Sequence, residues 1–205
     1  MSTKHLRALA VASACAVLAV TAGCTSTKHP VGTAAPAVHV VTGTPAPTPS
    51  ELSPEDQAQA DAEEAVREYF RVSNETRHDP EKFLDWQEVE TVATDTALSD
   101  LEQSLVSLWQ QGAHQVGDLK VEWIQLAPDG VDLTDNQTIT PPDVPNVQFR
   151  VCYDVSQVDS VTSDGKSVTQ PGRKDRAVFQ IGVTNYQYPS GPWLVGWVQQ
   201  TEETC

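Results

Sequence analysis

Two side chains of this sequence, His114 and Asp154, have the chemistry for proton transfer inside a folded domain. A histidine and a carboxylate act as general base and acid when they lie within hydrogen-bond reach of each other and of a substrate. His114 directly follows a predicted helix, where a turn histidine is usually exposed to solvent. Asp154 falls on the polar face of a predicted strand. The sequence therefore predicts no catalytic residue and favours a protein that is not an enzyme.

The acidic residues near position 132 are the candidates for binding a metal ion. Asp129, Asp132 and Asp135 recur at every third position, but the segment does not have the calcium-loop pattern with its glycine and distal glutamate at the required positions. The five histidines are scattered, and the chain has no Gly-rich phosphate loop and no Gly-x-Ser-x-Gly motif. We therefore expect a solvated acidic loop, no metal ion and no cofactor.

Four aromatic residues are the candidates for a ligand pocket: Tyr69, Trp109, Trp123 and Trp197. They would line the mouth of a cavity and receive an apolar ligand. The alternative, and the commoner outcome for aromatic residues at such spacing, is that they fill the core between helices and sheet. A third possibility is that an exposed sheet edge binds a strand of a partner protein.

The elements that must position these residues begin with helices. Ser53-Pro54 provides a capping side chain and a proline suited to the first helical position, and apolar residues then recur at helical spacing to about residue 74. A second, shorter helix is predicted from Asp79-Pro80 to about residue 90. A third contains the leucines from Leu98 to Leu108 and ends at Gly112.

After Gly112 the apolar period changes to two, which predicts β-strands. The predicted strands are 119–126, 147–155, 177–186 and 193–200. The first contains a phase flip typical of a β-bulge. Residues 129–145 predict a loop, and Asp164-Gly165 predicts a hairpin turn. Helices followed by antiparallel strands indicate an α+β fold, with the N-terminal helices packed on a curved antiparallel sheet.

This order of elements resembles the nuclear-transport-factor-2-like (cystatin-like) superfamily over residues 54–205. The local cues are "AVREYF", the strand "FRVCYDVS", the hairpin "DGKSV" and the closing "GPWLVGWVQQTEETC". The resemblance implies a cone-shaped domain, a fold that polyketide-cyclase-like enzymes also use with an Asp, Glu or His inside the cone. The whole chain resembles exported actinobacterial lipoproteins.

The first residues have the pattern of an export signal. Lys4 and Arg7 precede an apolar run over residues 8–23, which is shorter than the roughly 20 residues of a membrane-spanning helix. The segment "VTAGC" that ends at Cys24 resembles a bacterial lipobox, whose cysteine is acylated and becomes the new N-terminus. The resemblance implies a signal peptide over residues 1–23 and lipidation, such as palmitoylation, at Cys24. A secreted protein without a lipid, an uncleaved anchor and a lipid on Cys15 are the alternatives.

Residues 24–53 then form a linker rich in Pro and Thr, without an aromatic residue. Such a composition cannot build a core, and it favours extended polyproline-like geometry. We expect a disordered stalk that holds the domain away from the membrane.

The chain is strongly acidic, with 28 Asp and Glu against 13 Lys and Arg and a formal charge of −15. The predicted signal contains two of the basic residues and no acidic one, so the processed chain would carry −17. Phosphate backbones bind through Lys and Arg, which argues against nucleic acid as a partner. The charge is suited to keeping a surface protein soluble.

The cysteine count adds a covalent crosslink. If Cys15 leaves with the signal and Cys24 is acylated, Cys152 and Cys205 remain. An even pair in an exported chain predicts a disulfide; two free thiols are the alternative.

The sequence thus predicts three regions: signal peptide 1–23, lipidated Cys24 and linker 24–53, and α+β domain 54–205. The expected localisation is the extracytoplasmic face of the cell membrane, with the membrane and an envelope protein as partners. The expected function is non-catalytic binding of a ligand or a protein. A polyketide-cyclase-like or isomerase-like enzyme and a carrier of a small apolar ligand are the alternatives.

Overall fold

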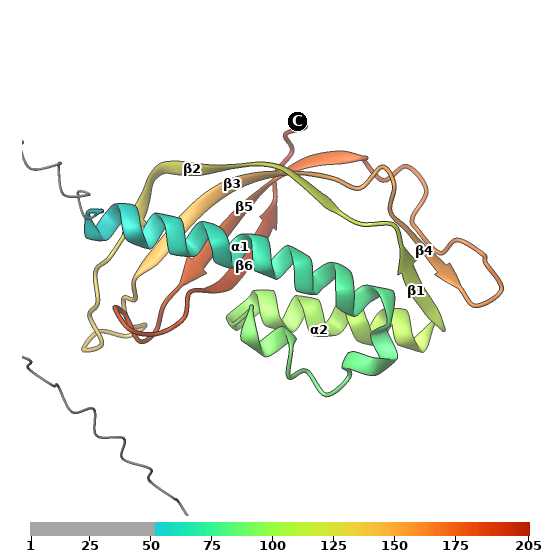
Figure 1. Cartoon of the computed structure of the whole chain (residues 1–205), viewed down its shortest axis with the longest axis horizontal. Helices are drawn as coiled ribbons and strands as arrows, with labels where there is room; N and C mark the ends of the chain where they lie inside the picture. Colours follow the sequence, from blue (N-terminus) through green and yellow to red (C-terminus); the bar gives the residue numbers. More distant parts are fainter. Residues whose placement is uncertain (1–51) are drawn as a thin grey trace, which may run out of the picture. The chain divides into compact units, whose positions relative to one another are not determined.

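Two amphipathic helices, α1 (Pro54–His78) and α2 (Asp95–Gln110), lie across one face of a curved antiparallel sheet (Figure 1). The computed structural model describes residues 52–205; the predicted signal peptide, Cys24 and the linker up to residue 51 lie outside them. Within residues 52–205, no helix has the length and apolar character needed to cross a membrane. The predicted α+β class is confirmed.

Helix α1 begins as its sequence predicts, because the Ser53 hydroxyl accepts the Asp56 N–H (3.1 Å) and Pro54 occupies the first turn. It continues one turn beyond the expected end near Asn74. The helix ends at His78 because Asp79 precedes a proline, which disfavours helical geometry at that residue. This extra turn contains Arg77.

The predicted second helix is wrong. Two short 3-10 helices, η1 (Pro80–Phe83) and η2 (Val89–Thr91), occupy this segment. Between them Trp86 adopts a φ of 63°, a left-handed conformation that interrupts a right-handed helix. The third predicted helix corresponds to α2, which starts at Asp95.

The main sheet has four antiparallel strands in the order β2-β3-β5-β6. Their bounds are β2 (Lys120–Asp132), β3 (Asn146–Asp154), β5 (Arg176–Thr184) and β6 (Leu194–Gln200). The register of β2 against β3 shifts between Val121 and Trp123, just before the phase flip that the sequence shows between Trp123 and Ile124. Each such irregularity adds local bend and twist to the sheet.

Strand β2 extends further than its sequence predicts. A second register shift, between Leu126 and Val131, carries the strand to Asp132, so the expected loop begins later than residue 129. Gly130 makes this possible, because a Cβ atom there would lie 2.7 Å from the carbonyl oxygens of Ala127 and Gln148. Only glycine allows such a close approach of backbones.

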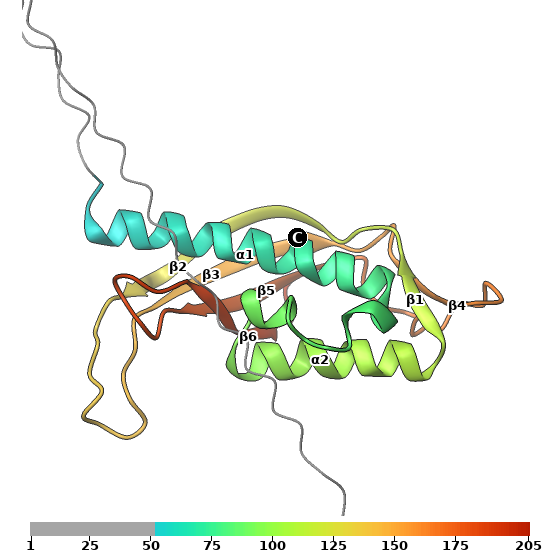
Figure 2. The same cartoon turned by 60° about the horizontal axis from the view of Figure 1, so that its bottom comes forward.

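A separate two-stranded ribbon, β1 (Ala113–Val116) paired with β4 (Asp159–Thr162), was not predicted. It lies beside the ends at which α1 and α2 finish (Figures 1 and 2). The predicted turn follows β4: Gly165 has a φ of 82°, and the Thr162 N–H donates to the Lys166 carbonyl (2.9 Å).

The apolar core lies between the helices and the inner face of the sheet. Helices α1 and α2 contribute Val66, Phe70, Leu101 and Leu105, which are all buried. The sheet contributes buried residues at alternate positions of its strands, as expected for one buried face. These are Val147, Phe149, Val151, Ile181, Val183 and Val195.

The predicted disulfide is present: Cys152 on β3 is bonded to Cys205, with 6.1 Å between their Cα atoms. Cys152 is buried and alternates with core residues, so the bond lies on the sheet face opposite the helices. The segment between β6 and Cys205 continues along β5, where the Val178 N–H donates to the Glu203 carbonyl (3.2 Å).

We predict that replacing both cysteines, Cys152→Ala with Cys205→Ala, lowers the free energy of unfolding by about 4 kcal/mol. The bond closes a loop with a sequence separation of 53, and the chain-entropy model assigns about that value to such a loop. Urea unfolding with and without dithiothreitol measures it. Dithiothreitol should destabilise the natural chain and leave the double variant unchanged. If the natural chain gives the same unfolding curve with and without dithiothreitol, the prediction is wrong.

Candidate functional site

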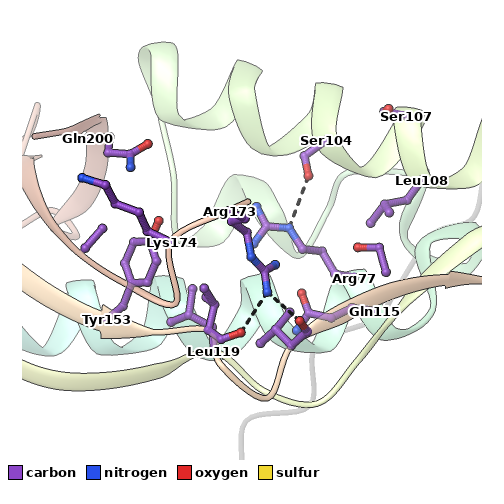
Figure 3. Close-up of a pocket in the computed structure, with 14 residues that line it drawn as sticks. Arg77, Ser104, Ser107, Leu108, Gln115, Leu119, Tyr153, Arg173, Lys174 and Gln200 are labelled. Atoms are coloured by element: carbon purple, nitrogen blue, oxygen red, sulfur yellow. Dashed lines mark hydrogen bonds between the residues drawn. The ribbon is translucent and has the colours of Figure 1, made fainter. Parts of the chain in front are cut away.

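A cavity of about 420 Å³ lies between the last turns of the two helices, the β1–β4 ribbon and the end of the sheet (Figure 3). Both helices, strands β1, β3, β4, β5 and β6, and the loops before β2, before β4 and before β5 contribute to it. The residues that line it are Arg77, Ser104, Ser107, Leu108, Gln115, Leu119, Tyr153, Val155, Val158, Ser160, Arg173, Lys174, Ala177 and Gln200. The size is typical of a site for a small organic molecule.

The charge of the cavity is opposite to that of the chain. Arg77, Arg173 and Lys174 line it, and no Asp or Glu does, although the chain has 28 acidic residues. Among residues 52–205, every arginine other than Arg77 and Arg173 forms an ion pair with a carboxylate. The two guanidinium groups at the cavity are therefore the ones left without a carboxylate partner.

Arg77 lies on the buried side of α1, four residues after Ser73 and eleven after Val66, so helical geometry directs it toward the sheet. Its Nε donates to the Ser104 hydroxyl of α2 (3.3 Å). Figure 3 shows the guanidinium extending into the cavity from α1. Burial lowers the pKa of Arg77, but a guanidinium remains charged at neutral pH.

Arg173 is held by backbone carbonyls. Its Nη2 donates to the carbonyl of Val155 (2.9 Å) and to that of Val158 (2.7 Å), in the turn that joins β3 to β4. The neighbouring Lys174 Nζ donates to the Glu202 carbonyl (3.3 Å). These contacts fix the position of two cations without neutralising them, because a carbonyl carries no net charge.

Tyr153 forms part of the cavity wall between the cations and the core. Its ring packs on Phe179, with 4.2 Å between the ring centroids. Burial raises the pKa of Tyr153 to about 12, although Arg77 and Arg173 act to lower it. The hydroxyl is thus protonated at neutral pH, and it can donate a hydrogen bond to an anion in the cavity.

A hydrogen-bonded pair of amide side chains, Gln115 and Asn74, fixes the rim. Gln115 is only 4% exposed, and its Nε2 donates to the Asn74 Oδ1 (3.0 Å) and to the Gly117 carbonyl (2.9 Å). Asn74 also exchanges two hydrogen bonds of 3.0 Å with the backbone of Leu119. This network ties α1 to β1 and to the turn before β2, so the cavity walls keep their relative positions.

The four aromatic residues predicted to form a pocket do not gather at one place. Tyr69 is buried in the core next to Phe70. Trp109 is 48% exposed on α2 and borders a separate depression with His78 and His114. Trp123 and Trp197 pair with Cys152 and Gly182, on the sheet face away from the helices. None of the four lines the cavity described above.

His114 and Asp154 are also placed apart from the cavity. His114 is part of β1, rather than of a turn, and it borders the depression beside Trp109. Asp154 accepts the Ser156 N–H (2.7 Å), which lowers the pKa of its carboxyl, and it pairs with Arg176 (3.4 Å). Within residues 52–205, no group of three or more His, Cys, Asp or Glu side chains is placed to hold a metal ion.

Sequence reasoning missed Arg77, Arg173 and Lys174. The available signal for Arg77 was its position on the buried stripe of α1, where a charged residue is unexpected. For the other two, it was a basic pair in a chain that is otherwise acidic. Neither signal indicates that residues nearly a hundred positions apart meet at one cavity.

Comparisons with known proteins add little. No family model matches this chain, and no curated protein does. Among solved structures, the intermembrane space region of the chloroplast protein ARC6 aligns with 12% identity and a TM-score of 0.39, covering 70% of this chain and 95% of that one. A similarity at this level supports no inference about activity.

We predict that stability decreases between pH 10 and about 12, in part because of Tyr153. The raised pKa of Tyr153 means that the folded state keeps the proton after the unfolded chain has lost it. The contribution of the Tyr153 environment to the free energy of unfolding is therefore complete below pH 10, and it is lost as the pH rises toward the pKa of Tyr153 in the folded state.

Absorbance titration and urea unfolding at several pH values measure this effect. In Tyr153→Phe, the tyrosine that ionises near pH 12 should be missing, and the loss of stability should be smaller. Tyr188→Phe, outside the cavity, should keep the tyrosine that ionises near pH 12. An unchanged titration in Tyr153→Phe would contradict the assignment.

Proposed function

We propose that residues 52–205 form a non-catalytic domain that binds a small oxyanion, a carboxylate or phosphate group, in the cavity at Arg77. The observation that carries this proposal is the set of three cations that faces the cavity with no carboxylate among the lining residues. Like charges that line one cavity repel one another, and the partly buried Arg77 has no carboxylate partner among residues 52–205. A bound oxyanion would compensate these charges.

The donors are of the types that recognise oxyanions. Because Nε of Arg77 is used by Ser104, its two terminal nitrogens remain for a bidentate contact with a carboxylate or phosphate. The hydroxyls of Tyr153 and Ser160 belong to the same lining. Neutral donors of this kind add specificity around the charged contact.

Binding is favoured over catalysis by the chemistry of the lining. General acid–base catalysis near neutral pH needs a His, Asp, Glu or comparable group, and no His, Asp, Glu or Cys lines the cavity. Tyr153, with its pKa of about 12, is a poor base at neutral pH. This favours the binding domain over the cyclase-like or isomerase-like enzyme.

We further propose that the domain belongs to a lipid-anchored protein on the extracytoplasmic face of the cell membrane, with the lipid on Cys24. The lipobox-like segment supports this, as does the disulfide between Cys152 and Cys205, since such bonds persist in oxidising compartments. Membership of the nuclear-transport-factor-2-like superfamily and an envelope protein as partner remain part of this proposal, on the resemblance given by the sequence.

We predict that inorganic phosphate binds at the cavity and that Arg77→Gln weakens this binding by at least tenfold. Hydrogen bonds to charged groups contribute about 1.5–3 kcal/mol each, and the variant removes a charge that other residues do not replace. NMR titration of the purified protein measures binding through shifts of the arginine side-chain and Ser104 signals.

Arg71→Gln is the matched control. Arg71 lies on the same helix, but it is exposed and paired with Glu68 and Glu75. Phosphate should bind this variant as it binds the natural chain. If phosphate causes no saturable shifts, or if both variants respond alike, the anion site is not at Arg77 and the proposal is wrong.

A second prediction tests the anchor. Cys24→Ser should move the protein from the membrane fraction to the soluble exported fraction, because acyl chains on one cysteine supply the membrane affinity. Intact mass analysis of the membrane-bound natural chain should find the acyl adduct. Cys15→Ser should leave the fractionation unchanged, and membrane retention of Cys24→Ser without an adduct in the natural chain would contradict the prediction.

A further inference from the structure

The cavity at Arg77 also has an apolar part, which binding of an anion by the cations does not explain. Five aliphatic residues are part of the same lining: Leu108, Leu119, Val155, Val158 and Ala177. A bare inorganic anion is compact and hydrated, and it gains nothing from aliphatic walls. An apolar group placed against those walls would gain about 25 cal/mol per Å² of surface removed from water.

Helix α2 gives the spacing between the polar and apolar parts. Ser104, which holds the Arg77 guanidinium, and Leu108 are four residues apart and therefore lie on the same face of α2. Their separation along the helix axis is about 6 Å. Figure 3 shows both side chains directed from α2 toward the cavity, with Arg77 below them.

We infer that the ligand is an amphiphilic oxyanion: a carboxylate or phosphate group at Arg77, joined to an alkyl or aryl body that lies along Leu108. This inference rests on the proposed anion site and names the class of molecule that the site takes. The oxyanion forms hydrogen bonds with Arg77 and Tyr153. The apolar body is covered by the aliphatic part of the lining.

The experiment compares methyl, butyl and octyl phosphate, each below its micelle concentration, by isothermal titration calorimetry with the natural protein. Each methylene that enters the cavity should tighten binding about three- to fourfold. Octyl glucoside, which lacks the anionic group, should bind far more weakly than octyl phosphate. Octanoate in place of octyl phosphate distinguishes the two head groups, because the tighter binder identifies the one that the site prefers.

Two variants separate the apolar contact from the anionic one. Leu108→Asn should flatten the dependence on chain length and change the affinity for methyl phosphate less than twofold. Val106→Asn, on the same helix but outside the lining, should keep the natural dependence. If Leu108→Asn fails to fold, Leu108→Ala should still reduce the gain from methyl to octyl phosphate.

The outcomes distinguish this inference from the proposed function. Equal affinities for the three phosphates, lost in Arg77→Gln, would overturn the amphiphilic ligand and leave the anion site intact. Binding that strengthens with chain length but persists in Arg77→Gln would indicate non-specific contact with exposed apolar surface and would overturn the inference. Binding of none of the phosphates would overturn both.

Discussion

The packing of α1 against the inner face of the sheet is the constraint on which the rest of the structure depends. Val66 and Phe70 of the helix share one core with Phe149 and Ile181 of the sheet, and each such buried side chain contributes about 1.5–3 kcal/mol. With 25 residues, the helix is about 37 Å long, so its buried stripe continues past the apolar core. Beyond the core, the stripe carries Ser73, Thr76 and Arg77, and there the interior becomes polar.

The polar end of the interior is the place where the proposed anion would bind to an otherwise acidic protein. The net charge of the chain acts over the Debye length of about 8–10 Å at physiological salt, whereas contacts inside the cavity act at hydrogen-bond distances with less screening. The cations at the cavity are fixed by Ser104 and by the carbonyls of Val155, Val158 and Glu202. Because these hydrogen-bond partners are neutral, they hold the cations in place without forming ion pairs with them. The same acidic surface elsewhere opposes non-specific binding of anions.

The disulfide connects the end of the chain to this arrangement. Cys205 is bonded to β3, and the residues before it pair with β5. Glu202 in this segment accepts the hydrogen bond of Lys174, and Gln200 at the end of β6 is part of the lining. A crosslink on the outer face of the sheet therefore stabilises one wall of a cavity on the inner face.

The sequence by itself determined the elements whose signals are local. Ser53-Pro54 and the helical stripe defined the start and type of α1, alternation defined the four main strands and the bulge in β2, and the cysteine count indicated the disulfide. It did not determine the segments with weak local signals. The four-residue strand β1 is too short for a period, and the left-handed Trp86 that divides the second predicted helix has no sequence marker.

Only the tertiary structure decided the site. Arg77 and Arg173 come from a helix and a loop far apart in the sequence, and their meeting depends on how α1 crosses the sheet and how β4 folds back to pair with β1. The aromatic residues expected at a pocket lie instead in the core, on the surface and on the outer face of the sheet. On the strands, the pleat and the register set the direction of each side chain, whatever its residue type. The local sequence pattern predicts which face of its own helix or strand a residue occupies. Which of these faces pack against one another is decided only when the whole chain folds.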